Sequence, residues 1–321
     1  MNQHRAPTPS ALVSLGAGAA VVGASLSTAL VLATADYAFR KITRPGGTAT
    51  LRSYTYTPWE VGLPWLDVAI PTTRGPLPAW WIPAEQPDAP IIVPLAGHGR
   101  SKSDLLGIAR YLWQAGFSCL MVDYRGLSET DGFIHSTLGF RETDDVLATI
   151  DWLARRNPGS PIGLLGYSMG GSIAILATAR DSRIGAVISD CGFSSQRDVV
   201  AYHVRRRVHI RPAASAVTAA TGALLRRRAG FAMDGVEPRA EIARIAPRPV
   251  FIIHGERDEI VPPAHAEEMY AAAGEPRRLW IIDGARHVEG YFVDRLRYCN
   301  EVAAFFEATL RSGAAEQVAA G

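Results

Sequence analysis

The sequence predicts an α/β fold, with a mostly parallel eight-stranded sheet and helices on both of its faces. Short apolar runs alternate with helical patterns from about residue 91 to residue 310, and strands separated by helices pair in parallel. The size and composition agree with this fold, because 321 residues with 48% hydrophobic and 20% charged residues can fill a large core.

The strand candidates are short runs of mainly apolar residues. In chain order they are Leu66–Ile70, Leu77–Ile82, Ile91–Leu95, Cys119–Asp123, Ile162–Leu165, Ile184–Asp190, Pro249–His254 and Leu279–Ile282. The first two are separated by a turn at residues 72–75, which predicts an antiparallel opening pair. Pro94 is unusual inside a buried strand, since proline cannot donate to a sheet.

The helix candidates show apolar residues at helical spacing. They are Leu105–Ala115, Glu142–Arg155, Ser172–Ala179, Ala264–Ala272 and Val288–Leu310. Between Ser194 and Ile245 the alternation stops, and a mostly helical, arginine-rich segment predicts a cap inserted into the sheet domain. Its arginine runs are typical of a solvated helix face, although they could also meet anionic lipid headgroups or an acidic substrate.

The N-terminus has no charged residue from Ala6 to Ala35, a length that can span a bilayer. We interpret residues 1–44 as an anchor and linker, with a transmembrane segment at about residues 11–35. Arg40, Lys41 and Arg44 outnumber the basic residues before the segment, which favours a cytoplasmic catalytic domain. The alternative is a signal peptide cleaved near residues 33–35, leading to secretion. Residues 45–313 then form the catalytic domain with its cap at about 194–245, and residues 314–321 a flexible tail.

The charge and the cysteines exclude several classes of protein. A net charge of +2 is too small to indicate a nucleic-acid partner. The cysteines are Cys119, Cys191 and Cys299, an odd number without metal-ligand spacing. The sequence therefore predicts no metal, and the oligomeric state stays open.

The segment from Gly166 to Gly170 reads Gly-Tyr-Ser-Met-Gly and lies between an apolar strand and a helix-forming run. This order is typical of a nucleophile elbow, which holds Ser168 in a strained turn above the sheet edge. Helix N-terminal N–H groups there favour a developing negative charge. We therefore expect Ser168 to be a catalytic nucleophile.

A serine nucleophile needs a base and an acid that orients the base. Asp258 follows the strand that ends at His254 and is the predicted acid, with Glu256 and Glu259 as local alternatives. Asp190, at the end of another strand, is a more distant alternative.

His287 follows the next strand and is the predicted base, which gives the order Ser, Asp, His along the chain. The other histidines lack a comparable position: His4, His98, His135, His203, His209, His254 and His265.

The oxyanion hole needs two backbone N–H donors. Met169, directly after the serine, is predicted to supply the first. The second is expected from the loop after the strand ending at Leu95, through the main chain of Arg100, with Gly99 as the alternative. His98 is expected to shape this loop.

Several motifs resemble the α/β-hydrolase superfamily, in its prolyl-oligopeptidase-like and serine-aminopeptidase-like branch of small esterases. The resemblance covers about Leu66 to Leu310. Its pieces are residues 97–99 (Gly-His-Gly), 123–126 (Asp-Tyr-Arg-Gly), 166–171, 248–250, 254–258 and 284–287. The chain departs from the usual pattern at residues 126–129, where it reads Gly-Leu-Ser-Glu.

The resemblance implies a Ser168–His287–Asp258 triad that needs no cofactor. We expect a carboxylesterase-like serine hydrolase that acts on a small-molecule ester or related acyl substrate. A peptidase, an amidase or an acyltransferase could use the same triad. A membrane-anchored binding protein with a relic site is the alternative outside enzymes.

Overall fold

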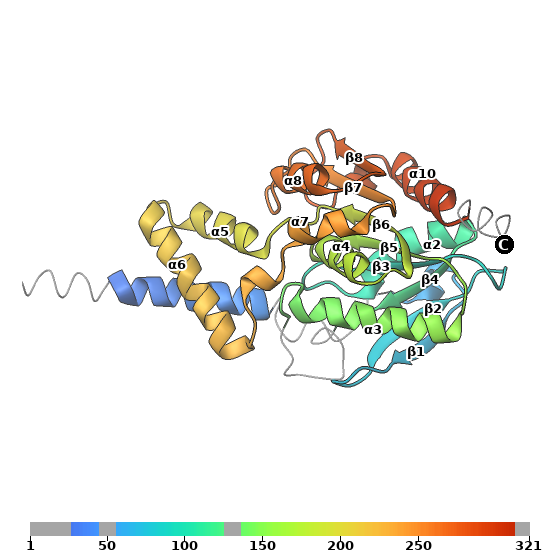
Figure 1. Cartoon of the computed structure of the whole chain (residues 1–321), viewed down its shortest axis with the longest axis horizontal. Coiled ribbons are helices and arrows are strands. Elements are labelled where there is room, and N and C mark those ends of the chain that lie inside the picture. Colours follow the sequence, from blue (N-terminus) through green and yellow to red (C-terminus); the bar gives the residue numbers. More distant parts are fainter. Residues whose placement is uncertain (1–26, 45–55, 125–135, 312–321) are drawn as a thin grey trace, which may run out of the picture.

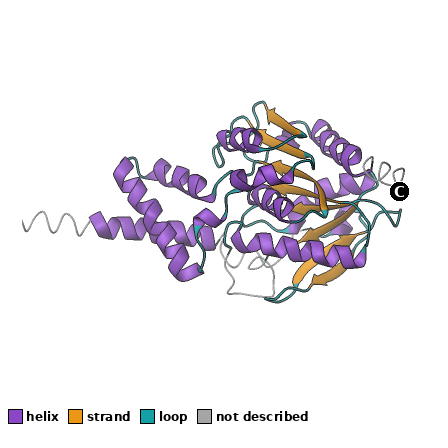
Figure 2. Cartoon of the chain, viewed as in Figure 1, coloured by secondary structure: helices purple, strands orange, loops and turns teal. Residues whose placement is uncertain are grey.

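The computed structural model describes residues 27–44, 56–124 and 136–311. An eight-stranded sheet forms its centre (Figures 1 and 2). The strands are β1 (Leu66–Ile70), β2 (Leu77–Ile82), β3 (Ile91–Leu95), β4 (Ser118–Val122), β5 (Ile162–Tyr167), β6 (Ile184–Asp190), β7 (Val250–Gly255) and β8 (Arg277–Ile282). They lie in the order β1-β2-β4-β3-β5-β6-β7-β8. β2 pairs antiparallel with β1 and β4, and all other pairs are parallel. This confirms the predicted sheet and its antiparallel opening pair.

Pro94 fits in β3 because of where the pairing with β4 ends. β4 pairs with β3 only at Ile91 and Ile92, while β5 pairs along all of β3, including Pro94 with Leu165. Proline at this position therefore removes no ladder bond on the β4 side.

Helices cover the two faces of the sheet (Figure 1). α2 (Leu106–Gln114) contacts α10 (Arg295–Phe306) on one face. On the other face, α3 (Phe140–Arg156), α4 (Met169–Arg180), α7 (Pro238–Glu241) and α8 (Ala264–Ala272) contact one another in succession.

The last predicted helix is interrupted. Instead of one helix over Val288–Leu310, the structure has a short α9 (Gly290–Val293) followed by α10. The break occurs at Asp294, whose side chain accepts a hydrogen bond from the N–H of Arg297 and so caps α10.

The inserted segment divides into two parts. α5 (Gln196–Arg207) and α6 (Arg211–Leu224) project from the sheet domain as a cap, at the left of Figure 1. The chain then returns through α7, and Ile242 and Ile245 are buried in the main hydrophobic core. The outer cap therefore ends before the predicted boundary at Ile245.

A helix over residues 27–43 packs against this cap. The sequence analysis assigns this part of the chain to an anchor and linker outside the catalytic domain. Ala35 and Ile42 share a buried cluster with Val200, Val204 and Val217 of the cap. The predicted membrane segment overlaps this helix, while its residues 11–26 lie outside the described part of the chain. In the part that the structure describes, no helix is both long enough and apolar enough to cross a bilayer.

Candidate active site

Ser168 lies at the tight turn between β5 and α4. Its backbone has φ 55° and ψ −120°, a region that L-residues enter at a cost. A Cβ on Gly166 would lie 2.1 Å from the Gly170 oxygen, and a Cβ on Gly170 would lie 2.3 Å from the Leu95 oxygen. Glycine is therefore required at both positions, as the elbow motif predicts.

His287 lies in the loop after β8, with each ring nitrogen facing one partner. Nε2 is 2.9 Å from the Ser168 Oγ, and Nδ1 is 2.7 Å from an Asp258 oxygen. Because the carboxylate can only accept, Nδ1 carries the proton and Nε2 is left to accept from the serine hydroxyl. The structure thus brings together the three residues of the predicted triad.

Asp258 is buried in the loop after β7. Its Oδ1 accepts from the N–H groups of Ile260 and Val261, both at 2.9 Å. Burial favours the neutral acid, but hydrogen bonds from His254 and His287 outweigh it and hold the pKa of Asp258 well below its usual range. The carboxylate therefore stays charged and fixes the imidazole.

None of the alternative acids contacts His287. Glu256 accepts from the N–H of Gly284, and Glu259 pairs with Arg206. Asp190 is fully buried and accepts from the Tyr298 hydroxyl at 2.6 Å. Each of these carboxylates has another partner, which leaves Asp258 as the acid at this site.

His254 is a site residue that the sequence analysis missed. It is fully buried, and its Nε2 lies 2.8 Å from the Val261 oxygen and 3.2 Å from Asp258 Oδ2. Since the carbonyl can only accept, this nitrogen carries a proton, which also faces Asp258. The sequence signal was its position, four residues before the acid at the end of β7.

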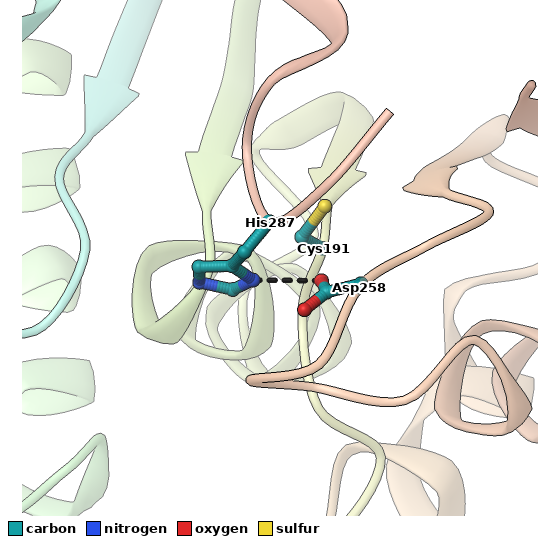
Figure 3. Close-up of side chains that lie close together, drawn as sticks. All are labelled: Cys191, Asp258 and His287. Atoms are coloured by element: carbon teal, nitrogen blue, oxygen red, sulfur yellow. Dashed lines mark hydrogen bonds and ion pairs between the residues drawn. The ribbon is translucent and has the colours of Figure 1, made fainter. Parts of the chain in front are cut away.

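Cys191 lies beside the triad (Figure 3). Three possible ligand atoms lie within 4.8 Å of one another here, one each from Cys191, Asp258 and His287, a spacing that a metal ion could use. Burial and the nearby Asp190 and Asp258 raise the pKa of the Cys191 thiol well above its ordinary value. His287 and Asp258 already bond to each other through the His287 Nδ1, so the predicted triad uses two of these three donors.

The two predicted oxyanion donors differ in whether their N–H groups already have a hydrogen-bond acceptor. Met169 begins α4, where the first N–H groups of a helix have no intrahelical acceptor. The Arg100 N–H, by contrast, donates to the Gly97 carbonyl at 3.1 Å. The prediction that Arg100 is the second donor is therefore corrected, because a tight turn already uses its N–H.

His98 and Gly99, the alternative donor, remain as candidates. Neither N–H has a backbone acceptor in the described residues. Both residues follow Gly97, where an added Cβ would lie 3.3 Å from the Ser168 Cβ, so this part of the loop passes beside Ser168.

The His98 ring connects this loop to the N-terminal helix. Its Nε2 donates to the Ile42 carbonyl at 2.8 Å. Burial is the main cause that lowers the pKa of His98, so the ring is neutral near pH 7. The sequence analysis missed this contact because it joins residues 56 positions apart.

Two cavities meet at Ser168. The first has a volume of about 340 Å³ and lies between the helix over residues 27–43 and α5. The second, of about 590 Å³, is lined by the loop after β3, by α2 and by the loop that carries His287. His98, Ser168 and Ile260 line both cavities.

A comparison with protein families identifies the family of this chain. The family described as X-Pro dipeptidyl-peptidase (S15 family) matches residues 66–246, more than half of the chain. The chain belongs to this family. Within the α/β-hydrolase superfamily, the S15 match covers the sheet from β1 to β6, the elbow and the inserted cap.

The chain is also similar to curated bacterial proteins. It is 27% identical over 223 residues to the uncharacterized protein YfhR of Escherichia coli K12, covering 67% of this chain and 70% of that protein. It is 29% identical over 195 residues to the uncharacterized protein YqkD of Bacillus subtilis, covering 60% of this chain and 63% of that protein.

Solved structures share the fold. The Pyrococcus furiosus esterase Pf2001 matches with a TM-score of 0.65 and 22% identity, over 80% of this chain and 96% of that one. The Pyrococcus horikoshii acylaminoacyl peptidase matches with a TM-score of 0.60 and 18% identity, over 77% of this chain and 42% of that one. The α/β-hydrolase fold predicted from the sequence is confirmed.

Proposed function

We propose that this chain is a serine hydrolase that cleaves carboxylic esters or related acyl bonds through an acyl-enzyme on Ser168. The continuous hydrogen-bonded series from Ser168 through His287 to Asp258 carries the proposal. A serine held against an unprotonated imidazole nitrogen is an activated nucleophile.

In the proposed reaction, Ser168 Oγ attacks the substrate carbonyl while His287 Nε2 takes the hydroxyl proton. The N–H group of Met169 and that of His98 or Gly99 stabilise the oxyanion, the second donor taking the role predicted for Arg100. His287 then protonates the leaving alcohol, and Asp258 stabilises the imidazolium. Water, deprotonated by His287, attacks the acyl-enzyme and releases the acid and the free serine.

The S15 match and the acylaminoacyl peptidase neighbour support a second candidate, a peptidase or amidase on the same triad. The two candidates differ only in the leaving group, an alcohol or an amine. Relative turnover of matched esters and amides distinguishes them.

A fluorophosphonate probe tests the proposal, because it reacts with an activated serine. We expect the probe to label the wild-type chain on the peptide that contains Ser168, and labelling to disappear in Ser168→Ala. His287→Ala should lower ester turnover by several orders of magnitude, as in other triads. Equal labelling of Ser168→Ala would overturn the assignment of the nucleophile. Absence of labelling in a folded wild-type chain would favour the relic site.

A further inference from the structure

The two cavities at Ser168 can be assigned to the two halves of an ester, which rests on the proposed function. His287 protonates the leaving group, so the leaving group lies on the His287 side of the carbonyl. His287 lines the second cavity but not the first. The first cavity is therefore the place for the acyl chain.

The inner wall of the first cavity is apolar. Phe193, Val199, Val200 and Val204 line it from the cap side, and Ile42 lines it from the N-terminal helix. Its volume of about 340 Å³ is at the lower end of the range for ligand pockets. Such a wall suits a hydrocarbon chain of moderate length.

Among the residues that the structure describes, two cations but no acidic side chain line the same cavity. They are Lys41 of the N-terminal helix and Arg207 at the end of α5. The Lys41 Nζ lies 5.7 Å from the centroid of the Tyr37 ring, and the Arg207 guanidinium carbon lies 5.9 Å from it. Both charges therefore converge on one aromatic side chain that also lines the cavity.

Neighbouring cations have carboxylate partners, whereas these two do not. Arg40 and Arg228 pair with Asp36, and Arg206 pairs with Glu259. Over the described ranges, Lys41 and Arg207 form no ion pair with an acidic side chain. Both side chains are exposed, so each is available to an anion in the cavity, which would be attracted by both positive charges.

We propose that the first cavity selects acyl chains that carry a negatively charged group away from the ester, and that Lys41 and Arg207 bind this group. The substrate class is an ester whose acyl chain has an apolar middle and an anionic end, either a carboxylate or a phosphate. The apolar wall holds the middle of the chain, and the two cations hold its end.

The test compares two esters that differ only in the far end of the acyl chain: 4-nitrophenyl octanoate and mono-4-nitrophenyl suberate. We expect the wild type to prefer the suberate by roughly tenfold in kcat/KM, which is the upper end of the size expected for two exposed charge pairs. The preference should fall as salt is added. In Lys41→Met/Arg207→Met the ratio of the two kcat/KM values should fall to about one.

Arg40→Met and Arg205→Met are the matched controls. Each removes one positive charge from the same two helices, but neither residue lines the cavity. Both controls should keep the preference for suberate. A wild type that hydrolyses the octanoate as fast as the suberate, or a double variant that keeps the preference, would overturn the proposal.

Binding to Ser168→Ala separates this proposal from the proposed function, because it needs no turnover. We expect monomethyl suberate to bind more tightly than methyl octanoate in calorimetry, and Lys41→Met/Arg207→Met to abolish the difference. Equal binding of the two esters would overturn the proposal even where the chain hydrolyses esters. Inhibition by octyl phosphate, measured against inhibition by monomethyl suberate, shows whether a phosphate or a carboxylate fits the cations better.

Discussion

At the scale of single residues, the acid of the triad is held by more than the base. Asp258 receives hydrogen bonds from two backbone N–H groups, from His287 and, at a longer distance, from His254. Four donors around one carboxylate keep it ionised and fix its orientation. We therefore propose His254 as a positioning residue, which would act on the proposed reaction through Asp258.

Replacing His254 by Phe should weaken both folding and turnover. The change leaves the Val261 carbonyl without this donor and removes one donor from Asp258. We expect the free energy of unfolding to fall by about 1–3 kcal/mol and kcat/KM to fall by roughly tenfold. His254→Gln, whose amide nitrogen can reach the Nε2 position, should restore much of both in urea unfolding and ester assays. Normal turnover in a stable His254→Phe variant would contradict the positioning role.

The pKa of Asp190 is shifted in the opposite direction from the pKa of Asp258. Burial raises its pKa, although the Tyr298 hydroxyl opposes the shift by donating to it. Because the pKa of Asp190 is higher in the folded chain than in the unfolded chain, protonation of Asp190 favours folding at low pH. This contribution to stability is present below the pKa in the unfolded chain, near 3.9, and is lost as the pH rises through the pKa in the folded chain. Above its pKa in the folded chain, the ionised and buried Asp190 therefore costs stability.

Asp190→Asn cannot ionise, so its stability relative to the wild type should rise as the pH is raised above about 4, the pKa of an unfolded aspartate. The measurement is the difference in unfolding free energy between the variant and the wild type at each pH. The control is Asp88→Asn at an exposed site, for which the difference should stay flat. A difference for Asp190→Asn that falls with increasing pH would contradict the assignment.

At the scale of elements, a buried ion pair fixes the loop that carries His98. The Lys102 ammonium lies 2.7 Å from Asp123 at the end of β4, with both side chains at most 2% exposed. The Lys102 N–H donates to the other carboxylate oxygen, and the ammonium lies 4.5 Å from the centroid of the Trp80 ring. The segment after β3 is therefore tied to β4 and β2.

Removing one partner of this pair should be more costly than removing both. Lys102→Met leaves the Asp123 charge buried without its ammonium and should lower the free energy of unfolding by about 3–5 kcal/mol. The double variant Lys102→Met/Asp123→Leu should recover part of that loss in guanidinium unfolding. A double variant less stable than the sum of both single changes would contradict this account.

The N-terminal helix can be separated from the segment before it by two truncations. A chain that begins at residue 27 keeps the cavity wall and the Ile42 carbonyl that accepts from His98. A chain that begins at residue 45 loses both, and it exposes the cap residues that pack on Ala35 and Ile42. We expect the first chain to retain ester hydrolysis and the second to lose most of its kcat/KM.

Circular dichroism and thermal unfolding of both truncations show whether a loss of activity is a loss of folding. His98→Ala in the full chain supplies the smaller perturbation, because it removes the hydrogen bond to Ile42 and the His98 ring but keeps the helix. Full activity in a folded chain that begins at residue 45 would contradict a role of this helix in the site.

At the scale of the whole molecule, the sequence predicted what depends on local patterns. Apolar runs located all eight strands, and the order of Ser168, Asp258 and His287 after three of them followed from chain positions alone. Parallel strand ends meet at one edge of a sheet, so a correct topology brings these loops together without knowledge of any side-chain contact.

The remainder depends on contacts between distant segments. Nothing local to Ile42 indicates that its carbonyl accepts from His98, and an uncharged N-terminal stretch predicts a membrane segment whether or not its end packs on a cap. The sequence also gives no sign that the Arg100 N–H is already used, because its hydrogen bond to the Gly97 carbonyl depends on how the loop turns. Hydrophobic patterns specify elements, whereas the partners of single N–H and C=O groups require the fold.

The meeting of two cavities at one serine has a consequence for the second half of the proposed reaction. Once the alcohol departs, the cavity that it occupied becomes the path by which the next nucleophile reaches the acyl-enzyme. The residues that bind the departing alcohol therefore also bind any alcohol that returns in its place. Whether this chain releases an acid or passes its acyl group to an acceptor is then set by the competition between water and alcohols for that vacated space.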